Sequence, residues 1–129
     1  MTVTYAVHKL DGIVTMANAG YSATELQFQL KDAGAVALFT CRPLLVAALE
    51  AAKGAGIPKE RIYILETAAP FISGKKALFK TVDSLIAEGR ALPAVEPLNW
   101  KKGQGRTQTG FLCYSSGTSG LPVSTAHYF

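Results

Sequence analysis

The stretch AVALFT at residues 35–40 is apolar from its first residue to its fifth and carries no charge. A short run that is apolar on both faces is typical of an interior strand of a parallel sheet, which helices cover on each side. Helical patterns flank it at residues 22–33 and 44–53, and another apolar strand follows at residues 62–65. Strands and helices alternating at this spacing predict right-handed crossovers and an α/β fold with a doubly wound parallel sheet and flanking helices.

Local signals set the ends of these helices. Residues 22–25, SATE, have the pattern of a capping box, and Gly34 is placed to end the first helix in a left-handed conformation. Pro43 suits the first turn of the second helix, because no N–H is needed there, and Gly54 with Gly56 should end it. Both helices are therefore delimited by the sequence itself.

The remaining segments give the expected organisation of the chain. An apolar run at residues 12–17 predicts a buried strand, and residues 82–88 predict a short helix that Gly89 ends. We expect an α/β sheet subdomain over residues 1–90 and a Pro- and Gly-containing linker over residues 91–109. A short C-terminal strand and loop should then occupy residues 110–129.

Residues 114–122 read YSSGTSGLP, in which six of the nine residues are Gly, Ser or Thr. Small residues let the backbone curl around an anion, and successive N–H groups beside hydroxyls form a concave donor surface for phosphate oxygens. An apolar strand at residues 111–114 leads into the run, and a return strand should start at Val123. This context favours a phosphate-binding loop over a flexible Ser/Gly-rich turn. The pattern is not that of a Walker loop, in which Lys directly follows the second glycine.

The longer stretch FLCYSSGTSGLP, residues 111–122, resembles the signature loop of the acyl-adenylate-forming superfamily, which includes acyl- and aryl-CoA ligases, luciferases and peptide-synthetase adenylation domains. Residues 7–22, VHKLDGIVTMANAGYS, resemble the segment that these enzymes carry upstream, and they are most similar to the 4-coumarate-CoA-ligase-like branch. Ala19 departs from the family, which usually has proline there. The resemblance implies about the second quarter of a full-length enzyme, within its N-terminal domain. It also favours a helix over residues 2–10, where the pattern alone leaves helix and strand open.

The resemblance also implies a cofactor site. Enzymes of this kind join a carboxylate to the α-phosphate of ATP in the presence of magnesium and expel pyrophosphate, so charge must be stabilised as the bond forms. The signature loop is associated with the β- and γ-phosphates through backbone N–H groups and hydroxyls. By position, the cofactor-binding residues would be Ser115, Ser116, Gly117, Thr118, Ser119 and Gly120.

The residues after Pro122 depart from the family. A lysine is expected next, and Val123 follows instead. Removing the family's Lys-Gly/Ala pair brings Val123 and His127 into register together, and His127 then resembles the histidine near the acyl pocket. Alternatively, the tail is unrelated sequence after a splice or frame change, and His127 is a surface residue. Both interpretations stay open, and His127 is the single candidate catalytic residue.

These departures shape the expected function. We expect a fragment of an ATP-dependent acyl- or aryl-CoA ligase that does not catalyse adenylation alone, because the loop lysine is missing and the family's later motifs lie beyond residue 129. One alternative is a non-catalytic pseudoenzyme that binds a small molecule or dimerises. Another is a remnant recruited for ATP-independent cyclisation or isomerisation, with candidate groups His8, Tyr114, His127 and Tyr128. Whether the chain is an enzyme is left open.

Composition limits the expected partners. The chain of 129 residues is 49% hydrophobic and 17% charged, which is apolar for so small a globular unit. We therefore expect exposed apolar surface and self-association as a homodimer or larger assembly. A small-molecule carboxylate is a further expected partner. The net charge of +4 includes two lysine doublets, a poor footprint for nucleic acid.

The sequence also bears on location and metals. It has no apolar stretch long enough to span a membrane and no pattern of a secretory signal, so no membrane partner is expected. Cys41 and Cys113 lie on apolar, strand-like segments without ligands nearby at metal-binding spacing, which predicts buried reduced thiols and a cytoplasmic chain. The acidic residues are scattered over helix faces and caps, so no metal site is predicted.

Overall fold

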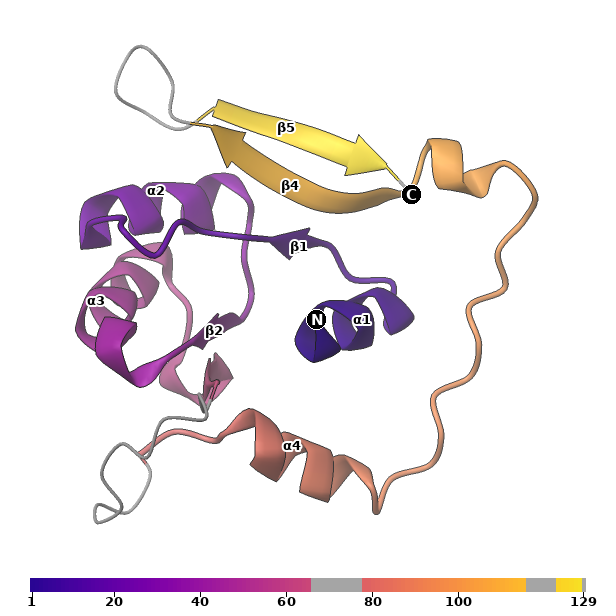
Figure 1. The fold of residues 1–129 in the computed structure, drawn as a ribbon, viewed down its shortest axis with the longest axis horizontal. Coiled ribbons are helices and arrows are strands. Elements are labelled where there is room, and N and C mark those ends of the chain that lie inside the picture. Colours follow the sequence, from indigo (N-terminus) through magenta and orange to yellow (C-terminus); the bar gives the residue numbers. More distant parts are fainter. Residues whose placement is uncertain (66–77, 116–122, 129) are drawn as a thin grey trace. The chain divides into compact units, whose positions relative to one another are not determined.

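The computed structural model of the chain describes residues 1–65, 78–115 and 123–128 (Figure 1). Its contacts group the residues into two units. The first unit joins Met1–Asn18 to Pro93–Phe129, and the second unit is Ala19–Leu92. Each unit is considered by itself.

The second unit alternates helices and strands, as its sequence predicts. Strands β2 and β3 pair in parallel, with Leu38 opposite Ile62, so the connection between them is a helical crossover. The order of elements is α2 (Ala23–Asp32), β2 (Leu38–Thr40), η1 (Arg42–Leu44), α3 (Leu45–Ala55), η2 (Lys59–Arg61), β3 (Ile62–Ile64) and α4 (Val82–Gly89). This arrangement confirms the predicted α/β class with parallel pairing.

The core of the second unit lies between α2, α3 and the two strands. Its buried members are 5% exposed or less, and burying a side chain the size of leucine or isoleucine stabilises a fold by about 1.5–3 kcal/mol. Alanines dominate the α3 side of the cluster, which lets the helices approach closely. The cluster consists of Leu30, Ala51, Ala52, Ile57 and Ile62, with Leu26, Ala35, Leu38, Leu49, Ala55 and Phe79 packed against it.

Helix α2 begins at the predicted capping box. The Ser22 hydroxyl accepts from the Glu25 backbone N–H at 3.3 Å, and the Glu25 carboxylate accepts from the Ser22 backbone N–H at 2.8 Å. The same carboxylate also accepts from the Ser22 hydroxyl at 2.6 Å. These hydrogen bonds to its charged form lower the pKa of Glu25 below its ordinary value, with the bond from the hydroxyl contributing most.

Helices α2 and α3 end in the same backbone motif. After α2, Gly34 has φ of +60°, its N–H donates to Lys31 O, and the Ala35 N–H donates to Leu30 O. After α3, Gly56 has φ of +78° and Ile57 donates to the carbonyl five residues before it. This pair of bonds is a Schellman motif, in which a left-handed residue lets the last carbonyls of a helix find donors. The predicted roles of Gly34 and Gly56 are confirmed.

The prediction that Gly54 helps to end α3 is wrong. Gly54 lies inside the helix, which continues to Ala55. A Cβ at Gly54 would overlap the side chain of Gln27 on α2, so the missing side chain serves the close approach of the two helices. The helix also starts one residue later than predicted, because Pro43 lies in the 3₁₀ turn that precedes it.

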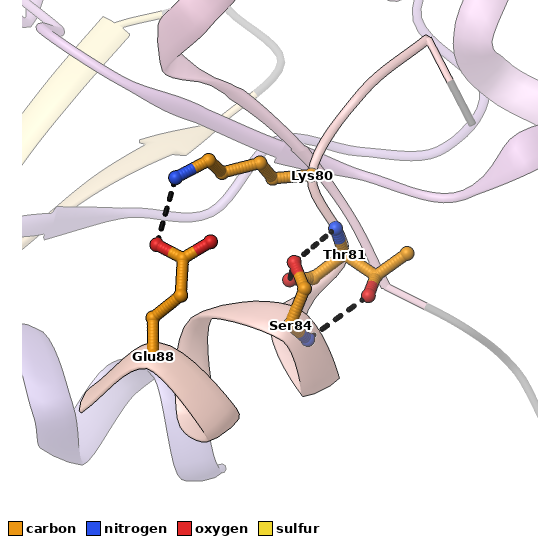
Figure 2. A network of polar contacts seen from close by, with 4 residues as sticks. All are labelled: Lys80, Thr81, Ser84 and Glu88. Carbon is orange, nitrogen blue, oxygen red and sulfur yellow. Dashed lines mark hydrogen bonds and ion pairs between the residues drawn. The ribbon is translucent and has the colours of Figure 1, made fainter. Parts of the chain in front are cut away.

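The residues that precede helix α4 are hydrogen-bonded to the end of strand β3. Ile64 and Thr81 form a parallel bridge, and the Ile64 N–H donates to Lys80 O at 3.0 Å. Thr81 and Ser84 then form a second capping box, each side chain accepting from the other's backbone N–H at 3.1 and 3.0 Å (Figure 2). The helix ends at Gly89, as predicted.

The first unit is a small mixed sheet with one helix. Its elements are α1 (Thr2–Lys9), β1 (Val14–Thr15), η3 (Gln104–Arg106), β4 (Thr109–Ser115) and β5 (Val123–Tyr128). The strand order is β1-β4-β5, with β1 parallel and β5 antiparallel to β4. The helix favoured for residues 2–10 and the return strand from Val123 are both confirmed. The hairpin of β4 and β5 is plain in Figure 1.

Strand β1 is shorter than the predicted strand at residues 12–17. The Gly12 N–H donates to Val7 O at 2.9 Å and the Asp11 N–H to His8 O at 3.0 Å, while Asp11 takes φ of +60°. This is the Schellman pattern again, with aspartate in the left-handed position. Gly12 therefore belongs to the end of α1, and the strand begins only at Val14.

The close approach at the end of α1 can be tested with Gly12→Ala. The added Cβ would lie 2.7 Å from Val7 Cγ1 and 3.1 Å from Val7 O, so the free energy of unfolding should fall by about 1–3 kcal/mol. Gly89→Ala is the matched control, because nothing lies within 4 Å of its Cβ position. It should be neutral or gain up to about 1 kcal/mol of helix propensity. Urea unfolding measures both, and equal effects of the two substitutions would contradict the close contact.

The capping box of α2 can be tested with Ser22→Ala. Loss of the hydroxyl should raise the pKa of Glu25 toward its ordinary value and cost about 1 kcal/mol of stability. A lowered pKa means that the carboxylate's contribution is present above the unfolded-state pKa and is lost as pH falls through the folded-state pKa. The variant should therefore lose less stability in acid. NMR titration of the Glu25 side chain measures the shift, with Thr24→Ala, exposed and outside the box, as control.

Candidate phosphate-binding site at the end of β4

Strand β4 leads into the Ser/Gly-rich run, and neighbours on both sides hold it. Phe111 lies opposite Val14 of β1 and opposite His127 of β5. Leu112 likewise lies between Thr15 and Ala126. The strand is thus the centre of its sheet at these two positions. Its far end, where the run begins, is fixed by this pairing.

The last turn of α1 also contacts β4. The Nε2 atom of His8 lies 3.0 Å from Gly110 O, and the imidazole meets the Phe111 ring edge-on, with centroids 4.8 Å apart at 86°. Because a carbonyl oxygen can only accept, Nε2 carries the proton in this bond. His8, a candidate for ATP-independent chemistry on sequence grounds, is therefore engaged with the strand that carries the loop.

A second polar contact joins the turn after α1 to the start of β4. The Gln108 side-chain amide donates to Asp11 Oδ1 at 2.9 Å. Asp11 is the left-handed residue of the turn, and Gln108 directly precedes the strand. The two residues are 97 positions apart in the sequence, so local sequence patterns could not predict this contact.

The two strand residues on either side of residues 116–122 are paired with each other. Ser115, the last residue of β4, lies opposite Val123, the first residue of β5. The seven residues between them, 116–122, therefore connect two paired strand ends. Ser115 is exposed there. The other predicted cofactor-binding residues lie outside the described residues: Ser116, Gly117, Thr118, Ser119 and Gly120.

The structure places His127 away from the end of the hairpin that carries the run. Its backbone lies opposite Phe111, four positions before Ser115, which corresponds to roughly 13 Å along the strand. Tyr128 lies farther still, opposite Thr109, whereas Tyr114 is the first residue of the run and lies opposite Ser124. Of the four candidate groups for ATP-independent chemistry, these three are spread along the hairpin backbone and His8 lies on α1.

A second polar cluster lies at the start of α4, in the other unit. The Lys80 ammonium and the Glu88 carboxylate are 2.7 Å apart, and the ion pair raises the pKa of Lys80 (Figure 2). A shallow hollow of about 330 Å³ is lined by Leu78, Phe79, Lys80, Thr81, Ser84 and Glu88. Its polar groups bond to one another, which fits a role in fixing α4 rather than in holding a ligand.

The fit to ATP and magnesium can be tested on the residues described. Ser115 suits a phosphate oxygen, since it is exposed and adjoins the run. Residues 1–65, 78–115 and 123–128 contain no group of three His, Cys, Asp or Glu side chains that could hold a metal ion. Among the described residues, Ser115 is therefore the one predicted cofactor-binding residue whose position is compatible with a phosphate ligand.

Two further predictions concern thiols and membranes. Neither Cys41, which follows β2, nor Cys113, which lies in β4, forms a disulfide with another described residue. Both are half-buried rather than fully buried as predicted. Within the described ranges, no helix is long and apolar enough to cross a membrane.

The α/β scaffold thus carries a Ser/Gly-rich connection, residues 116–122, between the paired strand ends Ser115 and Val123. The family model described as "AMP-binding enzyme" matches residues 1–123. The chain belongs to this family, whose enzymes use ATP and magnesium.

Individual relatives agree with the family. Acyl-CoA ligase cm3C from Cordyceps militaris is 37% identical over 120 residues, which cover 90% of this chain and 19% of the relative. Acyl-CoA ligase easD from Emericella nidulans is 36% identical over 118 residues, covering 90% of this chain and 21% of the relative. The chain thus spans about a fifth of the length of these ligases.

Solved structures show the same fold. The anthranilate CoA ligase AuaEII, crystallised in complex with anthranoyl-AMP, matches with a TM-score of 0.75 at 21% identity, over 98% of this chain and 22% of that one. A red-emitting luciferase from Phrixothrix hirtus matches with a TM-score of 0.70 at 19% identity, over 97% of this chain and 29% of that one. The predicted relationship to adenylate-forming enzymes and the predicted fold class are both confirmed.

Proposed function

We propose that the chain supplies the phosphate-binding part of an adenylate-forming acyl- or aryl-CoA ligase, and that the 129-residue polypeptide alone binds pyrophosphate weakly without adenylating a carboxylic acid. The observation that carries the proposal is the pairing of Ser115 with Val123. This pairing places the two strand ends that the Ser/Gly-rich residues connect side by side, and a short connection rich in Gly and Ser is the type of sequence that binds an anion.

The ligand class follows from the run and from the relatives. Backbone N–H groups and hydroxyls can bind phosphate oxygens even where no basic side chain is present. The β- and γ-phosphates are the part of ATP that leaves as pyrophosphate. Relatives of the chain are named acyl-CoA ligases, and one is named a phenylacetyl-CoA ligase. A small carboxylic acid, aliphatic or aromatic, is accordingly the proposed second substrate of the enzyme to which this part belongs.

Lack of adenylation by the polypeptide alone is proposed because of Val123. The sequence has an uncharged residue directly after Leu121-Pro122, where the resemblance predicts lysine. A fixed cation would compensate the charge of the phosphates and stabilise the charge that develops as the bond forms. Neutral donors remain, so some affinity for the anion should persist while the reaction does not proceed.

Association of the polypeptide with a second copy is a further proposal, supported by strand β5. In the described residues β5 pairs with β4 on one side and forms an outer strand of the sheet. Its six residues, VSTAHY, include no charge and no proline, the usual features that protect an edge strand from pairing with another chain. Antiparallel pairing of two copies of β5 would give a continuous six-stranded sheet.

A cytoplasmic location is also proposed, because Cys41 and Cys113 form no disulfide with a described residue. For ATP-independent cyclisation or isomerisation, no observation in the described residues adds support, and His8 already has a packing and hydrogen-bonding role.

The phosphate-binding proposal can be tested with Val123→Lys. The added ammonium should strengthen pyrophosphate binding about tenfold, and the gain should shrink as salt is added, because an exposed charge is screened. Calorimetric titration measures the affinity, with Val123→Met as the uncharged control. ATP–pyrophosphate exchange with a panel of aryl and fatty acids should show no turnover by the unmodified polypeptide. Turnover, or equal affinities of the lysine and methionine variants, would contradict the proposal.

Self-association can be tested with Ala126→Lys, at an exposed position of β5. A lysine on an edge strand opposes pairing with another edge, so the variant should be monomeric at concentrations where the unmodified chain forms dimers. Ala126→Ser is the control, since it keeps the size and adds no charge. Sedimentation velocity measures the masses, and a monomeric unmodified chain at micromolar concentration would count against the proposal.

A further inference from the structure

We propose that His8 is a positioning residue for the signature loop, acting through a β-bulge at Gly110. The inference rests on the proposed phosphate-binding function. It assigns to α1 a role that neither the sequence motifs nor the family match assigns. In this role, the imidazole holds the bulged backbone of β4 and so sets the direction of the strand up to Ser115, its last residue.

The bulge is defined by the strand register. Thr109 lies opposite Tyr128 and Phe111 lies opposite His127, so two steps along β4 match one step along β5. Gly110 is therefore the extra residue, with no partner of its own in β5. A bulge bends its strand and increases the local twist, and such bulges often lie next to functional sites.

The carbonyl of the bulge residue is held by His8. Gly110 is buried, where a backbone carbonyl without a partner would be costly. The Nε2–H of His8 donates to this oxygen at 3.0 Å, and the ring packs edge-on against Phe111, the next residue along β4. One side chain thus fixes both the bulge and the position after it.

The hairpin should respond to a displacement as one unit, because β4 and β5 are paired with each other. Their mutual pairing extends over most of both strands, whereas β1 is only two residues long. The His8 contacts and the Asp11–Gln108 bond add to that short pairing on the side of α1. A change at His8 should therefore tilt the hairpin and displace Ser115 without breaking the hairpin itself.

The test compares three substitutions at one position. His8→Gln keeps an amide N–H that can reach the Nε2 position, whereas His8→Asn is one carbon shorter and cannot reach Gly110. His8→Phe keeps the aromatic ring against Phe111 and has no donor. We expect amide hydrogen exchange in residues 111–115 to become about threefold to tenfold faster in the Asn and Phe variants, and to stay within about twofold of the unmodified chain in the Gln variant.

Pyrophosphate affinity provides the readout that a merely structural role would not move. Under conditions where each variant is fully folded, the dissociation constant should rise about threefold to tenfold for Asn and Phe and be rescued by Gln. Strands β2 and β3 belong to the other unit and are the internal control for exchange. Equal acceleration in β2, β3 and β4, with unchanged affinity, would overturn the proposal.

The role of His8 can still be tested if one variant does not fold or if the chain binds no pyrophosphate. If the Phe variant does not fold, the Gln and Asn pair still tests the donor. NMR of the unmodified chain should show the proton on Nε2 of His8, and a neutral ring protonated on Nδ1 alone would overturn the inference. If the unmodified chain binds no pyrophosphate, the proposed function fails, while the exchange rates of β4 still test the role of His8.

Discussion

Each of the first three helices is followed by one residue in the left-handed region, and the paths of the strands depend on these three positions. Asp11, Gly34 and Gly56 play this part after α1, α2 and α3. In each case two backbone N–H groups beyond the helix turn back to its last carbonyls. The chain thereby leaves the helix in a defined direction and reaches a strand within a few residues. In the second unit, the residue after the left-handed one also enters the core, as Ala35 and Ile57 do.

This constraint explains which parts of the fold the sequence could predict. The capping box at residues 22–25 and the glycines at 34 and 56 act within a few residues, so their pattern is sufficient. The starts of β1 and β2 were placed too early, at residues 12 and 35, because the apolar residues there complete the preceding helix end before the strand begins. Gly54 was misassigned for a different reason: its role depends on Gln27 of another helix, a contact that local pattern does not contain.

The candidate site divides in the same way. The Ser/Gly-rich run, its leading strand and its return strand are continuous in sequence, so their pattern alone predicts a strand, a connection and a return strand, as the pairing of Ser115 with Val123 requires. The bulge at Gly110 and its bond to His8 were not, because the two residues are 102 positions apart and a single histidine on a short helix has many explanations. The Thr81–Ser84 box was missed because serine replaces the usual glutamate or glutamine at its third position.

The first unit is built from two segments that are separated in the chain by the second unit, and this has a consequence for synthesis on the ribosome. Its sheet unites β1, near the N-terminus, with β4, which follows the whole of Ala19–Leu92 in the chain. The second unit can complete its parallel pairing as soon as its own residues have emerged. Strand β1 and helix α1, made before Ala19–Leu92, must wait for β4, and such long-range pairing is slow because a large loop has to close. These residues thus leave the ribosome before the second unit and find their partners after it.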